Sequence, residues 1–362
     1  MTGAIDPFQL VGQTLDGVYR LDHLVGEGGF GVVYRGFHLA FEQPVAVKCL
    51  KLPPQMSSDT REAFLRKFRE EGKLLYQLSQ ESLGIVRSIA LGDTVSPNGI
   101  WTPFVVLEWL EGTSLASDLE QRRAARLQGR PLNEVLSLLE VPARALAHAH
   151  ELRVAHRDIK PANLHVLPAR KPGAPPTLKV LDFGIAKVMA EGANAQHANA
   201  TAMGFQSFTP EYASPEQFNP TFGSTGPWSD VYSFALVVAE MLTDRPWCDE
   251  EDALKLMIAC TQSLSRPTPR RRGANIPDSV EAVFRRALSV PPTERQPDLA
   301  VFWQELVGAA RESATPASLI ALPASFVPGV TPPLAPSQAA PWAPAATGPF
   351  APSTAAPAPF AP

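Results

Sequence analysis

Cysteine is scarce in this chain, which has only Cys49, Cys248 and Cys260 among its 362 residues. Their spacing contains no CxxC pair, and no histidine pattern accompanies them. Zinc sites and disulfide frameworks usually show such patterns, so the sequence argues against both. The composition instead favours a reducing, cytoplasmic location.

A basic excess and long apolar runs are missing as well. The 32 basic and 36 acidic side chains leave a formal charge of −4, whereas proteins that read nucleic acid through its phosphates are usually strongly basic. No apolar run approaches the roughly 18 residues that a membrane-spanning helix needs. Residues 1–7 lack the basic-then-apolar layout of a signal peptide. We therefore expect no nucleic-acid partner and no membrane span.

Charge is also missing from residues 313–362, which contain no Asp, Glu, Lys or Arg but hold 13 of the 37 prolines. A segment of this composition cannot bury a core, so we expect residues 308–362 to be a disordered Ala/Pro-rich tail. Its repeated Pro-x-Ala-Pro pattern, as at 341–344 and 359–362, suits an extended polyproline conformation that a partner's aromatic groove could bind. A plain spacer is the favoured interpretation.

The rest of the chain shows strand patterns first and helix patterns later. Strands are expected at 19–25, 32–37, 45–52, 85–91, 101–109, 164–167 and 178–181, and helices at 58–79, 133–151, 229–243, 252–262, 278–288 and 298–308. This order predicts an α+β protein with two lobes. We expect an extension at 1–18, a β-rich lobe with one long helix at about 19–107, and a mainly helical lobe at about 111–307. Pro142 should kink its helix or end it early.

A glycine-rich segment with the pattern GxGxxGxV separates the first two strands. Glycines let backbone amides approach phosphate oxygens closely. A dinucleotide-binding turn has nearly the same pattern but leads into a helix, whereas Val32 and Val33 continue here as a strand. The pattern therefore predicts a hairpin over the phosphates of a nucleotide, formed by Gly26, Glu27, Gly28, Gly29, Phe30, Gly31 and Val33.

Lys48 lies in the next expected strand, Val45-Ala46-Val47-Lys48. Side chains two residues apart share a face, so Lys48 could reach phosphates where a flat ring covers Ala46. A solvated strand lysine is the alternative.

Glu71 lies in the following helix, on one apolar face with Phe64, Phe68 and Leu75. A carboxylate in such a stripe needs a cation, and Lys48 is the candidate. The neighbouring Glu70 lies off the stripe and would take this place only if the helix register is shifted by one residue.

Two further motifs follow in order, His156-Arg157-Asp158-Ile159-Lys160-Pro161-Ala162-Asn163 and Asp182-Phe183-Gly184. Together with the glycine loop and the strand lysine, they resemble the signature set of the protein kinases, in particular the bacterial eukaryotic-like serine/threonine protein kinases. The resemblance covers about residues 19–307. It implies the two-lobed kinase fold and transfer of the γ-phosphate of ATP to serine or threonine hydroxyls of protein substrates.

The same resemblance implies the roles of the chemical residues. Asp158 would accept the proton of the substrate hydroxyl, and Lys160 would contact the γ-phosphate. Asn163 and Asp182 would bind Mg²⁺, with Mn²⁺ as a possible substitute. Lys48 would contact the α- and β-phosphates and be held by Glu71.

Other implied roles concern the adenine pocket and the scaffold. Leu107 would guard the back of the pocket, and the backbone of Glu108 and Leu110 would bind adenine. His165 would lie beneath the adenine ring, where the family usually has an aliphatic residue. The resemblance also implies two structural contacts. Glu216 would form an ion pair with Arg295, and Asp230 would cap the backbone of the catalytic loop, residues 156–163.

Three departures from the family pattern stand out, and His165 is one. The interval from Asp158 to Asp182 is long because of a Pro-rich turn at 169–176, and Phe208 replaces the common glycine before Thr209. Between Asp182 and Glu216, the expected activation loop offers Thr201 and Ser207 as candidate autophosphorylation sites. The alternative function is a nucleotide-binding pseudokinase scaffold that signals through its tail, but the intact Lys48, Asp158, Asn163 and Asp182 argue against it.

Overall fold

The computed structural model describes residues 5–29, 31–52, 56–169, 171, 175–183, 210–246, 253–261 and 266–313. All of them belong to one compact unit, residues 1–328. Several sequence predictions therefore lie outside the described residues: Phe30 in the glycine loop, Gly184, the candidate phosphorylation sites Thr201 and Ser207, and residues 314–362 of the expected tail. The expected start of the tail at residue 308 was wrong, because residues 308–312 belong to the last helix, Leu299–Glu312, where Ala309 and Ala310 are buried.

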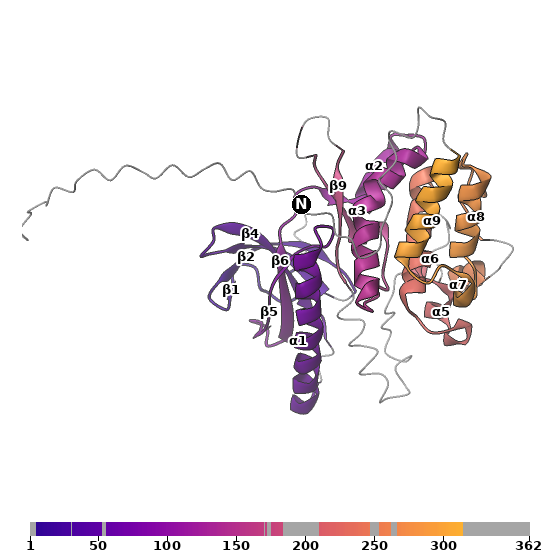
Figure 1. Ribbon diagram of the computed structural model, residues 1–362. Coiled ribbons are helices and arrows are strands. Elements are labelled where there is room, and N and C mark those ends of the chain that lie inside the picture. The colour runs from indigo at the N-terminus through magenta and orange to yellow at the C-terminus, as the bar shows by residue number, and fades with distance from the viewer. Residues whose placement is uncertain are drawn as a thin grey trace, which may run out of the picture. The chain divides into compact units, whose positions relative to one another are not determined.

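The small lobe is built on a six-stranded antiparallel sheet with the order β1-β2-β3-β4-β6-β5 (Figure 1). Its strands are β1 (Thr14–Leu15), β2 (Tyr19–Glu27), β3 (Gly31–His38), β4 (Gln43–Leu50), β5 (Ser88–Val95) and β6 (Trp101–Glu108). β2 and β3 pair across the glycine loop, which confirms the predicted hairpin. A side chain at Gly31 would come within 2.5 Å of the carbonyl oxygen of Cys49, so only glycine allows β3 and β4 to approach this closely there.

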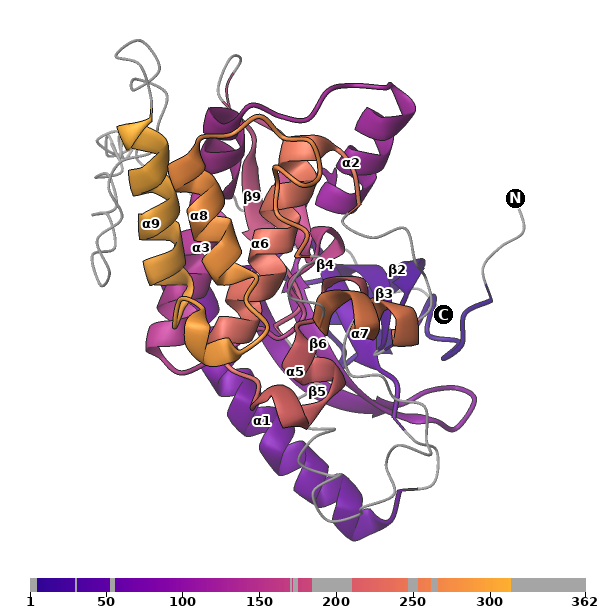
Figure 2. The same cartoon turned by 90° about the vertical axis from the view of Figure 1, so that its right-hand side faces the viewer.

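Helix α1 (Ser58–Glu81) lies beside this sheet (Figure 2). The side chain of Ser57 accepts a hydrogen bond from the amide of Thr60 and so caps its first turn. Phe68 is fully buried against Leu50 and Val105 of the sheet. This packing fixes which face of α1 is turned toward the cleft between the lobes.

Residues 5–18 precede the expected start of the domain at Tyr19, yet they pack into the small lobe. Phe8 and Leu10 are buried in one cluster with Leu21, Tyr34 and Phe104. The hydroxyl of Tyr34 donates a hydrogen bond to Asp6, with an oxygen–oxygen distance of 2.5 Å. The described part of the N-terminal segment is therefore continuous with the core of the lobe.

The large lobe combines a small sheet with a stack of helices. The sheet has the order β7-β8-β9 and consists of β7 (Thr113–Ser114), β8 (Leu164–Leu167) and β9 (Thr177–Val180). The helices are α2 (Leu115–Ala124), α3 (Leu132–Glu151), α5 (Pro215–Phe218), α6 (Pro227–Thr243), α7 (Ala253–Thr261), α8 (Asp278–Ala287) and α9 (Leu299–Glu312). Figures 1 and 2 both show α9 beside α3, α6 and α8.

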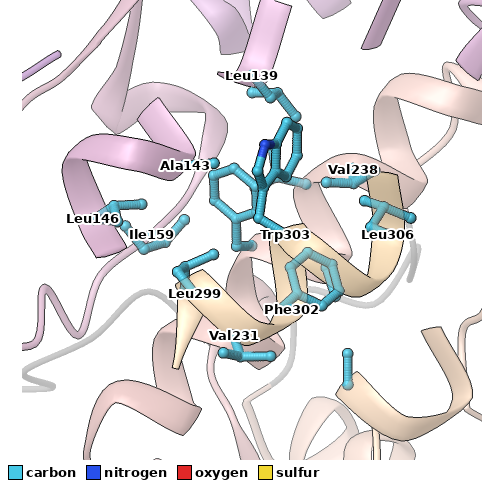
Figure 3. Packing of buried hydrophobic residues seen from close by; sticks show 14 of the residues in the cluster. Leu139, Ala143, Leu146, Ile159, Val231, Val238, Leu299, Phe302, Trp303 and Leu306 are labelled. Carbon is cyan, nitrogen blue, oxygen red and sulfur yellow. The ribbon is translucent and has the colours of Figure 1, made fainter. Parts of the chain in front are cut away.

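The core of the large lobe forms where these helices meet. Trp303 of α9 is 1% exposed and lies among residues from α3 and α6, including Leu139, Ala143 and Val238 (Figure 3). Ile159 of the catalytic loop belongs to the same cluster. The loop that is expected to carry the chemistry is thus anchored directly in the core.

The observed elements follow the predicted order in kind, and the structure adds four elements that had no predicted range: α2, α5, β1 and β7. A kink or an early end was expected at Pro142, and α3 continues through this residue to Glu151, so the early end does not occur. Proline removes one helical hydrogen bond, but Pro142 is buried among apolar neighbours on α3, and this packing offsets the loss. None of the described helices is long and apolar enough to cross a membrane.

Candidate active site

A cavity of about 560 Å³ lies between the two sheets. Most of the predicted chemical residues line it, from both lobes: Gly26, Glu27, Gly28, Gly29, Gly31, Val33, Lys48, Leu107, Asp158, Lys160, Asn163 and Asp182. The fold therefore gathers motifs that are more than 150 residues apart in the sequence around one space. We call this space the cleft cavity.

Lys48 forms an ion pair with Asp182, with a nitrogen–oxygen distance of 2.8 Å. The predicted partner, Glu71, is half-buried and forms no ion pair within the described part of the chain. Glu71 lies on α1 between Phe68 and Leu75, which both line the cleft cavity, so the helix face was predicted correctly. The pairing differs because Asp182 occupies the position next to the ammonium group.

Asp230 organises the backbone of the catalytic loop. Its two carboxylate oxygens accept hydrogen bonds from the amides of His156 and Arg157, at 2.6 and 2.7 Å. His150 Nε2 lies 2.9 Å from Asp230 Oδ2. Because His150 Nδ1 accepts a hydrogen bond from the amide of Leu299, the ring proton is on Nε2 and is donated to Asp230. Burial acts to raise the pKa of Asp230, but the hydrogen bonds from His150 and His156 outweigh it and lower the pKa.

Asp158, Lys160 and Asn163 converge at the end of this loop. The Lys160 ammonium lies 3.2 Å from Asp158 Oδ2. The side-chain amide of Asn163 donates to the backbone carbonyl and to Oδ2 of Asp158, at 2.7 and 3.1 Å. Asp158 is thus held in a fixed orientation with its side chain 10% exposed.

Asn163 and Asp182 fit a magnesium ion. Both line the cleft cavity, and the amide nitrogen of Asn163 is engaged by Asp158, which leaves its oxygen as the group that can bind a cation. Asp182 adds a carboxylate. Such oxygen donors suit Mg²⁺, which usually takes one or two protein ligands together with substrate phosphates.

The catalytic loop contacts the two residues that flank Asp182. His156 Nε2 lies 2.7 Å from the carbonyl oxygen of Leu181, and its ring lies 4.8 Å from the ring of Phe183. Asp182 has φ of 53° and Arg157 has φ of 62°, which non-glycine residues rarely adopt. Backbone strain of this kind is often found at functional sites, where surrounding contacts maintain it.

The hinge, which is the segment from the end of β6 to Gly112, joins the two lobes. Leu107 lines the cleft cavity and pairs with Ala46 across the sheet. Gly112 has φ of 120°, and a side chain there would come within 2.0 Å of the carbonyl oxygen of Val166. The hinge therefore passes too close to β8 for any residue but glycine.

His165 lies on β8 near this glycine, with Nε2 facing the site of a Gly112 side chain at 3.4 Å. Burial lowers the pKa of His165, although the backbone of Glu111 acts in the opposite direction. Four of the described residues that were predicted to lie near the adenine ring do not line the cleft cavity: Ala46, Glu108, Leu110 and His165. Their contact with adenine stays a prediction.

Glu216 and Arg295 form a fully buried ion pair. Two guanidinium nitrogens donate to the two carboxylate oxygens at 2.8 and 2.9 Å, and Ser229 donates to the same carboxylate. A two-pronged pair of this kind is geometrically specific, so it ties the segment after the activation loop to the helices of the large lobe.

Sequence reasoning missed several residues of the site. Phe68, Leu75, Ser114 and Ala162 also line the cleft cavity, and Lys179 forms an ion pair with Glu108. Lys179 alternates with the buried Leu178 and Val180, and a single cation in an apolar strand is the signal that could have identified it.

Comparison with known proteins identifies the family of this chain. Residues 19–302 match the family model of the protein kinase domain. The serine/threonine-protein kinase pkn3 of Myxococcus xanthus is 31% identical over 310 residues, covering 85% of this chain and 52% of that protein. The serine/threonine-protein kinase PknA of Mycobacterium tuberculosis is 30% identical and covers 91% of this chain and 71% of that protein.

The solved structures similar to this chain show the same fold. The PknI kinase domain of Mycobacterium tuberculosis has a TM-score of 0.58 and 22% identity, covering 83% of this chain and 98% of that one. Among the curated relatives, the chain spans about half the length of pkn3 and 39% of PrkC of Bacillus subtilis. On the match over residues 19–302, the chain belongs to the protein kinase family, among its bacterial eukaryotic-like serine/threonine members.

Proposed function

We propose that this protein transfers the γ-phosphate of ATP to serine or threonine hydroxyls of protein substrates. The observation that carries the proposal is the convergence of Lys48, Asp158, Asn163 and Asp182 on one cavity under the glycine loop. These groups supply the positioning and charge stabilisation on which phosphoryl transfer depends.

The resemblance to the kinase signature gives each residue its role, and the contacts within the site support the assignment. Asp158, oriented by Asn163 and Lys160, would accept the proton of the attacking hydroxyl. Lys48 would leave Asp182 for the α- and β-phosphates when nucleotide binds, and Lys160 would contact the γ-phosphate. Asn163 and Asp182 would hold Mg²⁺, which would supply charge neutralisation at the phosphates.

Partner and location are proposals of the same kind. The buried free thiols of Cys49 and Cys260 suit a reducing, cytoplasmic compartment. A plain spacer stays the favoured interpretation of the tail, and its Pro-x-Ala-Pro repeats are the segment that a polyproline-binding partner would recognise.

The test is incubation of the full chain with radiolabelled ATP, magnesium and a generic basic-protein substrate. Lys48→Met and Asp158→Asn should each lower transfer by about 100-fold or more, because each removes a group that acts on the transferred phosphoryl or on the attacking hydroxyl. The exposed Lys73 of α1 provides the control, since Lys73→Met should retain wild-type activity. Wild-type protein that binds ATP but transfers no phosphate would instead favour the scaffold function.

A further inference from the structure

The ion pair between Glu108 and Lys179 joins the hinge to the strand that leads to Asp182. Glu108 is the last residue of β6, and Lys179 lies on β9. The carboxylate of Glu108 also accepts the amide of Arg87 at 2.8 Å, while its own amide donates to the carbonyl of Arg87 at 3.0 Å. Both the side chain and the amide of the hinge residue are thus engaged.

Partial burial makes this pair different from an ordinary surface ion pair. The side chains of Lys179 and Glu108 are 12% and 26% exposed. Exposed ion pairs contribute little because water screens them, whereas removal of one partner from a desolvated pair leaves the other charge without compensation. Loss of Lys179 should therefore release the Glu108 side chain toward water and loosen the hinge.

The segments that meet at this pair are those that define the nucleotide site. The amide of Val86 donates to the carbonyl of Val180 at 3.0 Å, and the amide of Val180 donates to Gly84 at 2.7 Å. One residue further, the amide of Leu181 donates to the carbonyl of Asn163 at 2.8 Å. Lys179 thus connects the hinge to a strand that is fixed on both sides.

We propose that Lys179 is a positioning residue for the nucleotide. By holding the side chain of Glu108, it fixes the hinge backbone in the orientation that receives the adenine ring. The inference rests on the proposed function for the identity of the nucleotide, but it does not require that phosphate is transferred.

Direct binding of MgADP to the full chain, measured by titration calorimetry, is the first test. Lys179→Met should raise the Kd for MgADP by roughly five- to tenfold, and Lys179→Arg should restore most of the affinity. Steady-state kinetics should show the same rise in KM for ATP with kcat changed by less than about twofold, because the groups at the phosphates stay in place.

Arg286→Met is the matched control. It removes a cation that pairs with Glu305 between α8 and α9, away from the cleft cavity, and should leave the Kd for MgADP unchanged. If Lys179→Met and Arg286→Met raise the Kd for MgADP to the same extent, the effect is a general loss of stability and the proposal is wrong.

Glu108→Gln keeps an oxygen for the amide of Arg87 and removes only the charge, so it tests the pair with little risk to folding. It should raise the Kd for MgADP as Lys179→Met does. The double variant should have a Kd no higher than that of the weaker-binding single variant. Unchanged affinity in Glu108→Gln, or additive losses in the double variant, would overturn the proposal. Normal MgADP binding without phosphate transfer by wild type would refute the proposed function alone.

Discussion

His165 shows at the scale of a single residue how the site departs from its family pattern. Its ring nitrogen Nε2 is buried and has no hydrogen-bond partner among the described residues. A buried polar atom without a partner costs free energy of about 1–3 kcal/mol, and burial lowers the pKa of this histidine below its ordinary value of 6.5. Burial therefore favours the neutral form of His165 in the folded protein.

Replacement of this residue by leucine should affect stability in a pH-dependent way. Because the pKa of His165 is lower when folded, the unfolded chain binds more protons, so the wild type loses stability as the pH falls below about 6.5. His165→Leu lacks this loss, and its advantage in melting temperature should be larger at pH 5.5 than at pH 7.5. The KM for ATP should fall or stay unchanged, and a severalfold rise would mean that the imidazole makes a polar contact with the nucleotide.

The choice of partners is what the sequence could not predict at this scale. Ordered motifs identified Lys48, Asp158, Asn163 and Asp182, because the chemistry requires these residue types at these spacings. Periodicity placed Glu71 on the correct face of α1, but a face does not determine a distance. Lys48 meets Asp182 at 2.8 Å instead, and this outcome depends on how the lobes and α1 pack.

At the scale of the elements, the kind and order of strands and helices followed from periodicity, whereas the boundary of the small lobe did not. Residues 5–18 have no strong strand or helix pattern, so they were expected to be an extension. The structure places Phe8 and Leu10 in the core of the small lobe. They cover an apolar surface of the sheet, although they precede residues 19–302, which match the kinase domain. Similarly, buried packing overrides the local preference of Pro142 in α3.

Truncation of Leu10 tests whether this segment stabilises the lobe. Leu10 is 1% exposed, while its neighbour Val11 is 43% exposed. Leu10→Ala should lower the free energy of unfolding by about 3 kcal/mol, through lost burial and the cavity that it leaves, whereas Val11→Ala should change it by less than about 0.5 kcal/mol. Equal effects of the two substitutions in urea denaturation would show that residues 5–18 do not belong to the lobe's cooperative core.

At the scale of the whole molecule, the catalytic loop is connected to both ends of the expected activation loop. Asp182 begins that loop beside Lys48, and Glu216 ends it in the buried pair with Arg295. The carbonyl of Arg157 accepts a hydrogen bond from Gln217, just after the loop. Both ends of the expected activation loop are thus held by side-chain contacts, and we propose that the segment between them is regulated by phosphorylation.

We therefore expect autophosphorylation at Thr201, with Ser207 as the second candidate; both lie outside the described residues. A phosphate there adds a charge of about −1.5 to −2 and could pair with Arg157, which would order the loop for substrate binding. Mass spectrometry should find this phosphate in wild type and not in Lys48→Met, because the variant cannot transfer it. The double variant Thr201→Ala, Ser207→Ala should lose about tenfold in activity toward a generic substrate. Full activity in that variant, or active wild type with phosphate on neither residue, would refute the proposal, because loop order would then not depend on these hydroxyls.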